Sequence, residues 1–261
     1  MNNFRSNFLD SIPPIVKNLI VINIIMWLAT EVSPNIFGRL GIDGNLTDFL
    51  GLHYWSSSKF NAAQLVTYMF MHGGFTHLFF NMFSLYMFGG LLEQLWGPKR
   101  FLFYYLITGV GAGIVQQLFW TIEFQPVISA INQGLSSNSG EALLPISEFL
   151  SRYMDITNLT AIVTPQMLEL KQALFNAPIT VGASGSVFGL LLAFGWLFPD
   201  LKLMLLFFPV PIKAKYFVLM YGVAELFLGV ARFSGDNIAH FAHLGGMLFG
   251  AILIMYWKKK R

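Results

Sequence analysis

The sequence predicts an all-α membrane protein, a single domain built from six membrane-spanning helices. Hydrophobic residues make up 55% of its 261 positions, and Phe alone occurs 27 times. Only 11% of the residues are charged, whereas soluble domains carry about 25%. The apolar residues are also spread along the chain, in several stretches of about the 20 residues that cross a bilayer. We therefore expect residues 1–261 to form one helical bundle in lipid.

Apolar runs that end at polar, Gly or Pro residues mark the expected spans. The first follows a polar stretch with Arg5 and Asp10 and lacks a convincing small-residue cleavage site, so we expect an uncleaved anchor. A long segment, 121–180, is rich in Ser, Asn and Gln and is expected to be an outer insertion with one amphipathic helix at 165–175. The six expected spans lie near 16–31, 65–92, 101–120, 181–198, 216–233 and 239–257.

The distribution of charge predicts the orientation of the bundle. Six spans place both ends of the chain on one side, and most Lys and Arg residues fall on that side, including the tail 258–261. Basic residues accumulate on the cytoplasmic side of membrane proteins. We therefore expect a multi-pass protein of the bacterial inner membrane with both termini in the cytoplasm. Because these cations flank spans, the net charge of +3 does not indicate a nucleic-acid partner.

Composition and periodicity restrict the possible chemistry. The chain contains no Cys, which excludes disulfides and thiolate catalysis. Any nucleophile must therefore be Ser, Thr, Lys, Asp or Glu. No repeat of fixed period is evident, so neither a solenoid nor an inverted-repeat transporter is indicated.

A few polar side chains interrupt the expected spans. Each costs on the order of 0.6–3 kcal/mol in the membrane unless it is paired or faces water. Spans two, four and six run in the same direction, so depth follows from position at about 1.5 Å per residue. Ser184, His243, His77 and Asn81 then lie at similar depth, nearer the outer face. The full set is His72, His77, Asn81, Glu93, Ser184, Glu225, His240 and His243.

Small residues accompany two of these side chains at helical spacing. Gly246 and Gly250 share the face of His243, and three glycines lie close to Ser184 on span four. Small residues at such spacing let membrane helices approach closely. We therefore expect spans four and six to be neighbours, with Ser184 facing His243. His240 lies about one turn nearer the surface, where we expect water to compete for its hydrogen bonds.

A serine hydroxyl within hydrogen-bond distance of an imidazole is the minimal activated nucleophile. The histidine acts first as a base and later as an acid toward the leaving amine. Asn81 and His77 could donate hydrogen bonds to the oxyanion that develops on the attacked carbonyl. The amide of Ser184, near the start of a helix, would add to that oxyanion site.

Each of these residues also has a purely structural interpretation. Ser in a membrane helix usually serves packing, and His or Asn can bond neighbouring helices. It is their coincidence at one depth beside glycines that favours a site. Glu93 is expected to pair with Lys99 or Arg100, and His72 to make a supporting contact near the water boundary. No partner for Glu225 can be identified from the sequence.

Four segments of the sequence resemble the signature segments of the rhomboid intramembrane proteases, in the order of that family. The resemblance covers residues of about 60–257, and four motifs together are far more specific than Gly-x-Ser-Gly alone. The chain has Ala63 and Gln64 where many relatives have Trp-Arg, and its segment 121–180 is longer than in compact members. The four segments are HGGFTHLFFN at 72–81, GGLLE at 89–93, GASG at 182–185 and AHLGGMLFG at 242–250.

This resemblance implies a rhomboid-like bundle that hydrolyses transmembrane protein substrates near the outer leaflet of the lipid bilayer. It implies a dyad of Ser184 as nucleophile and His243 as base. It places His77 and Asn81 in the oxyanion site and gives His72 a supporting role. It also implies no metal and no cofactor.

Two alternatives belong to other functional classes. One is a catalytically inactive relative that binds membrane helices, against which the intact Ser184 and His243 argue. The other is a protein with a histidine-based metal site. The sequence lacks His-Glu-x-x-His, has no Cys ligand and shows no acidic residue beside the deep histidines.

Overall fold

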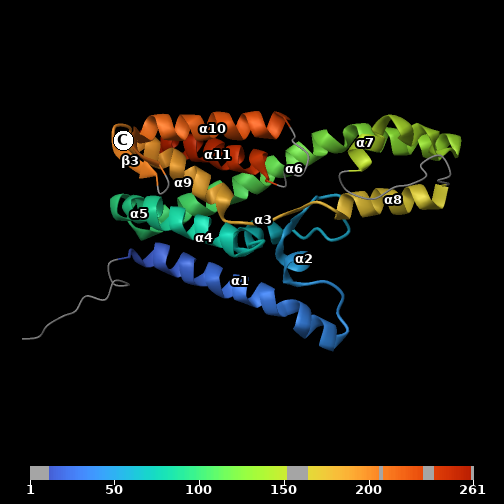
Figure 1. Cartoon of the computed structure of the whole chain (residues 1–261), viewed down its shortest axis with the longest axis horizontal. Coiled ribbons are helices and arrows are strands. Elements are labelled where there is room, and N and C mark those ends of the chain that lie inside the picture. The colour runs from blue at the N-terminus through green and yellow to red at the C-terminus, as the bar shows by residue number, and fades with distance from the viewer. Residues whose placement is uncertain (1–11, 152–163, 206–207, 232–237, 260–261) are drawn as a thin grey trace, which may run out of the picture.

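The computed structural model describes residues 12–151, 164–205, 208–231 and 238–259, and most of them are helical (Figure 1). A shorter apolar helix, α9 (Ser184–Leu197), lies among the longer ones. This architecture confirms the predicted all-α membrane bundle. In the described residues, five helices are long and apolar enough to cross a membrane: α1 (Pro14–Leu40), the helix over Phe75–Trp96, α6 (Pro98–Ser137), α10 (Ala214–Ala231) and α11 (His240–Lys259).

The second spanning helix begins later than predicted. Instead of one helix over 65–92, the chain forms α3 (Gln64–Thr67) and the 3-10 turn η2 (Tyr68–Phe70), leaves the helix, and resumes at Phe75. Gly73 and Gly74 lie in the break, where glycine favours non-helical backbone. From there the helix is continuous, with one π-helical turn: α4 (Phe75–Ser84), η3 (Leu85–Gly89) and α5 (Gly90–Trp96).

The third helix is longer than the sequence suggested. It does not end at residue 120 but continues to Ser137. Its extension buries Phe124, whose ring contacts Phe149 and Phe175. These partners belong to α7 (Ser147–Leu150) and α8 (Thr164–Asn176), the latter at the position of the expected amphipathic helix. The described parts of 121–180 therefore form a helical extension beyond one end of the bundle (Figure 1); residues 152–163 lie outside the described ranges.

Short elements connect the helices. The 3-10 helix η4 (Gly140–Ile146) precedes α7, and α2 (Leu46–Leu50) follows α1. Two small antiparallel sheets pair β1 (Leu52–His53) with β2 (Ile179–Thr180), and β3 (Lys202–Leu205) with β4 (Phe208–Lys213). The β1–β2 pair brings the chain from α8 back to the bundle immediately before α9.

Glu93 fastens the start of α1 to α5. Its carboxylate accepts hydrogen bonds from the backbone N–H groups of Ile15 and Val16, at 2.9 and 2.8 Å. The first N–H groups of a helix have no partner within it, and a carboxylate there also opposes the helix dipole favourably. This buried side chain therefore bonds to backbone amides, and the expectation that it pairs with Lys99 or Arg100 was wrong.

The centre of the bundle is held by glycine contacts between α6, α9 and α11. A Cβ atom on Gly246 of α11 would overlap the carbonyl oxygen of Gly185 on α9. A Cβ atom on Gly189, one turn further along α9, would lie 2.7 Å from the Cβ of Thr108 in α6. The backbones of α9 and α11 thus touch, and α6 packs closely on α9 through the side chain of Thr108, which requires glycine at these positions.

The close contact between Gly246 and Gly185 predicts how a substitution at Gly246 changes stability. Gly246→Ala should lower the thermal midpoint of the protein in detergent, because its methyl group forces α9 and α11 apart at a cost of about 1–3 kcal/mol. Gly222→Ala is the matched control, since its Cβ would meet only the side chain of Met247, whose Cε lies at 3.4 Å, an ordinary contact. Equal midpoints for the two variants would contradict the close packing described here.

Candidate active site

Ser184 is the first residue of α9, and the turn before it depends on glycine. Gly182 has φ +123°, a backbone conformation that other residues rarely adopt. Its N–H donates to the carbonyl of Tyr68 at 2.9 Å. A Cβ atom on Gly182 would also lie 2.8 Å from Nε2 of His77. The turn therefore places the serine at a helix start with the His77 ring beside it.

His243 reaches the same point from the first turn of α11. Its Nε2 atom lies 2.8 Å from Oγ of Ser184, a hydrogen bond between residues 59 apart in the sequence. The imidazole stacks on the ring of Phe188, with the centroids 4.2 Å apart and the planes at 7°. The stacking on Phe188, together with the close contact between Gly246 and Gly185, keeps the imidazole directed at the hydroxyl.

A third side chain, Glu225 of α10, completes this cluster. Its Oε2 atom lies 2.9 Å from Nδ1 of His243 and 2.7 Å from Nδ1 of His240. All three side chains are buried. The expectation that water competes for His240 was wrong, because His240 and His243, three positions apart on α11, both turn toward α10.

The glycines around Glu225 are a sequence signal for the helix that supplies its partner. Gly222 and Gly229 lie three positions before and four after it, and residues at these spacings share one helix face. In the structure this face meets α11: a Cβ atom on Gly229 would lie 3.0 Å from the Cβ of His240. A glutamate on a helix face marked by glycines therefore indicates a polar partner on the neighbouring helix.

The other predicted residues line α4 and the segment before it. Asn81 is buried, and its Nδ2 donates to the carbonyl of His77 at 2.9 Å, which leaves its second N–H unused by that bond. His77 is half-buried. In the part of the chain that the structure describes, no hydrogen bond joins either side chain to Ser184. The structure thus places the His77 ring beside Gly182, two residues before the serine, and Asn81 one turn further along α4.

His72 is buried, with 2% of its surface exposed, and so does not lie at a water boundary as expected. Its ring contacts that of His77 edge to face, with the centroids 5.1 Å apart. Within the described ranges, neither of its ring nitrogens has a hydrogen-bond partner. His72 therefore lies behind His77, where its ring limits the positions that His77 can take.

The cluster of Glu225, His240 and His243 also has the composition of a metal site, since one donor atom from each lies within 4.8 Å of the others. In three dimensions an acidic residue does lie beside the deep histidines, contrary to the expectation from the sequence. The distances nevertheless favour hydrogen bonds. Tetrahedral zinc with bonds of about 2.0–2.1 Å separates its ligand atoms by about 3.3 Å, more than the 2.7 and 2.9 Å found here.

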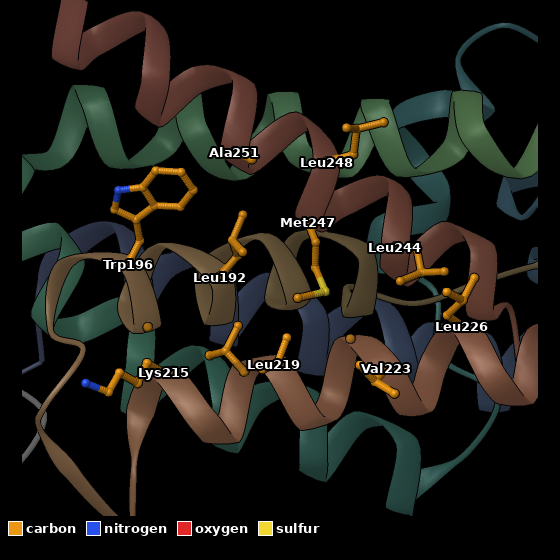
Figure 2. A pocket seen from close by; sticks show the side chains of 13 residues that line it. Leu192, Trp196, Lys215, Leu219, Val223, Leu226, Leu244, Met247, Leu248 and Ala251 are labelled. Carbon is orange, nitrogen blue, oxygen red and sulfur yellow. The ribbon is translucent and has the colours of Figure 1, made fainter.

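An apolar groove of about 560 Å³ lies between α9, α10 and α11 but is separate from this cluster. Its walls include Leu192, Leu219 and Met247, and Lys215 lies at one end (Figure 2). Neither Ser184 nor His243 lines it. This hollow between the helices is therefore not where the serine and histidine meet.

The fold and the site define a multi-pass helical membrane protein in which three helices converge on a serine, two histidines and a glutamate. The family model of the Rhomboid domain matches residues 59–127 and 150–260. The chain therefore belongs to the rhomboid family, as the resemblance of its motifs indicated.

Two eukaryotic proteins whose names identify them as rhomboid proteins are moderately similar in sequence to this chain. "Rhomboid protein 1, mitochondrial" of Saccharomyces cerevisiae is 29% identical over 153 residues, which cover 59% of this chain and 42% of that protein. "Rhomboid-like protein 11, chloroplastic" of Arabidopsis thaliana is 29% identical over 126 residues, covering 48% of this chain and 42% of that protein. The matched regions thus span less than half of each relative.

Proposed function

We propose that this protein is a serine endopeptidase that cleaves peptide bonds within or next to the transmembrane segments of other membrane proteins. The observation that carries the proposal is the hydrogen bond of 2.8 Å between Oγ of Ser184 and Nε2 of His243 inside an apolar bundle. Membership of the rhomboid family supports the same activity. An inactive relative would have no need of this pairing.

The reaction follows from the positions of these two groups. Oγ of Ser184 attacks the carbonyl carbon of the substrate while its proton passes to Nε2 of His243. The tetrahedral intermediate collapses to an ester on Ser184, and His243 gives the proton to the nitrogen of the leaving amine. Water then attacks the ester with His243 again as base, which releases the acid product and restores the serine hydroxyl.

Negative charge on the attacked oxygen needs donors close to Ser184. As the first residue of α9, Ser184 has an amide N–H without a partner inside its helix. Asn81 keeps one unused N–H, and the His77 ring lies against Gly182, two residues before the serine. These three groups are the proposed oxyanion site, and His72 supports the ring of His77 from behind.

The apolar surface of the bundle supports the proposal that it contacts lipid and other membrane proteins. Exposed apolar side chains cover α1 and α10, among them Ile25, Leu28, Leu219 and Phe227, as contact with lipid requires. The start of α1, the end of α5, β3 and the C-terminal end of α11 lie at one end of the bundle (Figure 1). We propose that this end, which carries Lys99, faces the cytoplasm of a bacterial inner membrane. The proposed substrates are transmembrane proteins that reach the bundle through the bilayer.

The serine mechanism predicts the behaviour of one small substitution. Ser184→Ala should give a folded, membrane-inserted protein without proteolysis of a transmembrane test substrate in liposomes, because it removes only the nucleophilic hydroxyl. A fluorophosphonate probe should label the unaltered protein but not this variant, and a chelator should leave cleavage unchanged. Cleavage by Ser184→Ala, or cleavage lost to the chelator, would refute the proposal in favour of metal chemistry. A folded parent chain that is never labelled would identify an inactive binding protein.

The proposed oxyanion role of Asn81 predicts a particular kinetic change. Asn81→Ala should reduce kcat more than it raises KM, because an oxyanion donor acts mainly in the transition state and is worth about 2.7–4 kcal/mol. Steady-state cleavage of a reconstituted transmembrane substrate measures both constants. A rise in KM with unchanged kcat would assign Asn81 to substrate positioning or helix packing instead.

A further inference from the structure

Glu225 is an acidic side chain in the middle of an otherwise apolar helix. Only 8% of its surface is exposed, whereas the next two residues, Leu226 and Phe227, are 52% and 63% exposed. Burying a carboxylate is costly unless other groups compensate its charge. Its position therefore calls for an explanation from the groups that it contacts on α11.

The contact with His243 fixes where the histidine carries its proton. With Glu225 ionised, its carboxylate only accepts hydrogen bonds, and the proton between Oε2 and Nδ1 then belongs to His243. In a neutral imidazole with Nδ1–H, the other nitrogen has a free lone pair. That nitrogen, Nε2, is the one 2.8 Å from Ser184. The opposite tautomer would carry its proton on Nε2 and could not accept the proton of the serine.

His240 holds the same carboxylate oxygen from one turn away. Its Nδ1 lies 2.7 Å from Oε2, so two N–H donors converge on one oxygen with two lone pairs. The close approach of Gly229 to His240 keeps α10 and α11 in contact at this level. The carboxylate is therefore fixed on both sides before any substrate binds.

The same arrangement responds to the charge that forms during the reaction. When His243 takes the proton of Ser184 it becomes a cation, 2.9 Å from a carboxylate that is already in place. In a site with little water this attraction is stronger than in solution, and no group has to reorganise to provide it. The ground state has no comparable cation on His243, so the carboxylate favours the transition state.

We propose that Glu225 is a positioning residue for the catalytic histidine, making the site a Ser184–His243–Glu225 triad whose carboxylate is anchored by His240. This inference rests on the proposed serine protease function. Glu225 acts through His243, by setting its tautomer and stabilising its cation, and does not touch the reacting atoms.

The test is Glu225→Gln in the full chain, reconstituted with a transmembrane substrate. The variant keeps the shape of the side chain and removes its charge. We expect kcat to fall by a factor of about 10⁴, the loss seen when the carboxylate of other serine protease triads is neutralised, with KM nearly unchanged. An unchanged kcat would overturn the inference.

Glu93→Gln is the matched control, because Glu93 is also buried but binds the backbone of α1 instead of a histidine. It should lower the thermal midpoint and leave kcat near that of the unaltered chain. If Glu225→Gln and Glu93→Gln lowered kcat equally and in proportion to their loss of thermal stability, Glu225 would be a structural residue.

A measurement on the unaltered chain does not depend on whether a variant folds. Nitrogen-15 NMR of the His243 ring should show the proton on Nδ1, and Glu225→Gln should shift population to the form with the proton on Nε2. A ring protonated only on Nε2 in the unaltered chain would contradict the inference directly.

Failure of this inference can be told apart from failure of the proposed function. If the fluorophosphonate probe labels Ser184 and Ser184→Ala is inactive, the serine mechanism stands whatever the result for Glu225. If Ser184→Ala still cleaves substrate, both the proposed function and the triad fall together.

Discussion

Direct backbone contact between α9 and α11 is the constraint on which the site depends. A serine side chain is short, so its hydroxyl can reach an imidazole on another helix only where the two backbones lie close together. Gly185 follows Ser184 directly, and Gly246 lies one turn below His243 and touches the carbonyl of Gly185. The packing of the bundle thus sets the distance of 2.8 Å between the two functional groups.

The acidic side chains inside the bundle need hydrogen-bond partners, because the interior around them is apolar. Glu93 meets two backbone N–H groups, and Glu225 meets two imidazoles. Neither carboxylate could remain in an apolar interior without such partners. His72 differs, because neither of its nitrogens has a partner among the described residues.

The sequence predicted features that depend on one helix at a time, such as its apolar character and its glycine-marked face. Apolar composition indicated the membrane bundle, and glycine spacing predicted the faces of Ser184 and His243 that the structure places together. Partners contributed by distant segments were harder to predict. The extension of α6 is buried against α7 and α8, and these segments lie beside it only once the chain has folded. The polar partners of Glu93 were backbone amides, which no side-chain pattern reveals.

Helix packing and the carboxylate contribute to the site in separable ways. The glycines of α9 and α11 fix a distance, while Glu225 fixes the tautomer of the imidazole at one end of that distance. Glu225 comes from α10, whose buried face is narrow and whose remaining surface is apolar and exposed. Its hydrogen bonds to His240 and His243 therefore join α10 to α11 at the level of the nucleophile. Any displacement of α10 that breaks these bonds leaves the serine and histidine adjacent but removes the group that keeps Nε2 free to accept a proton.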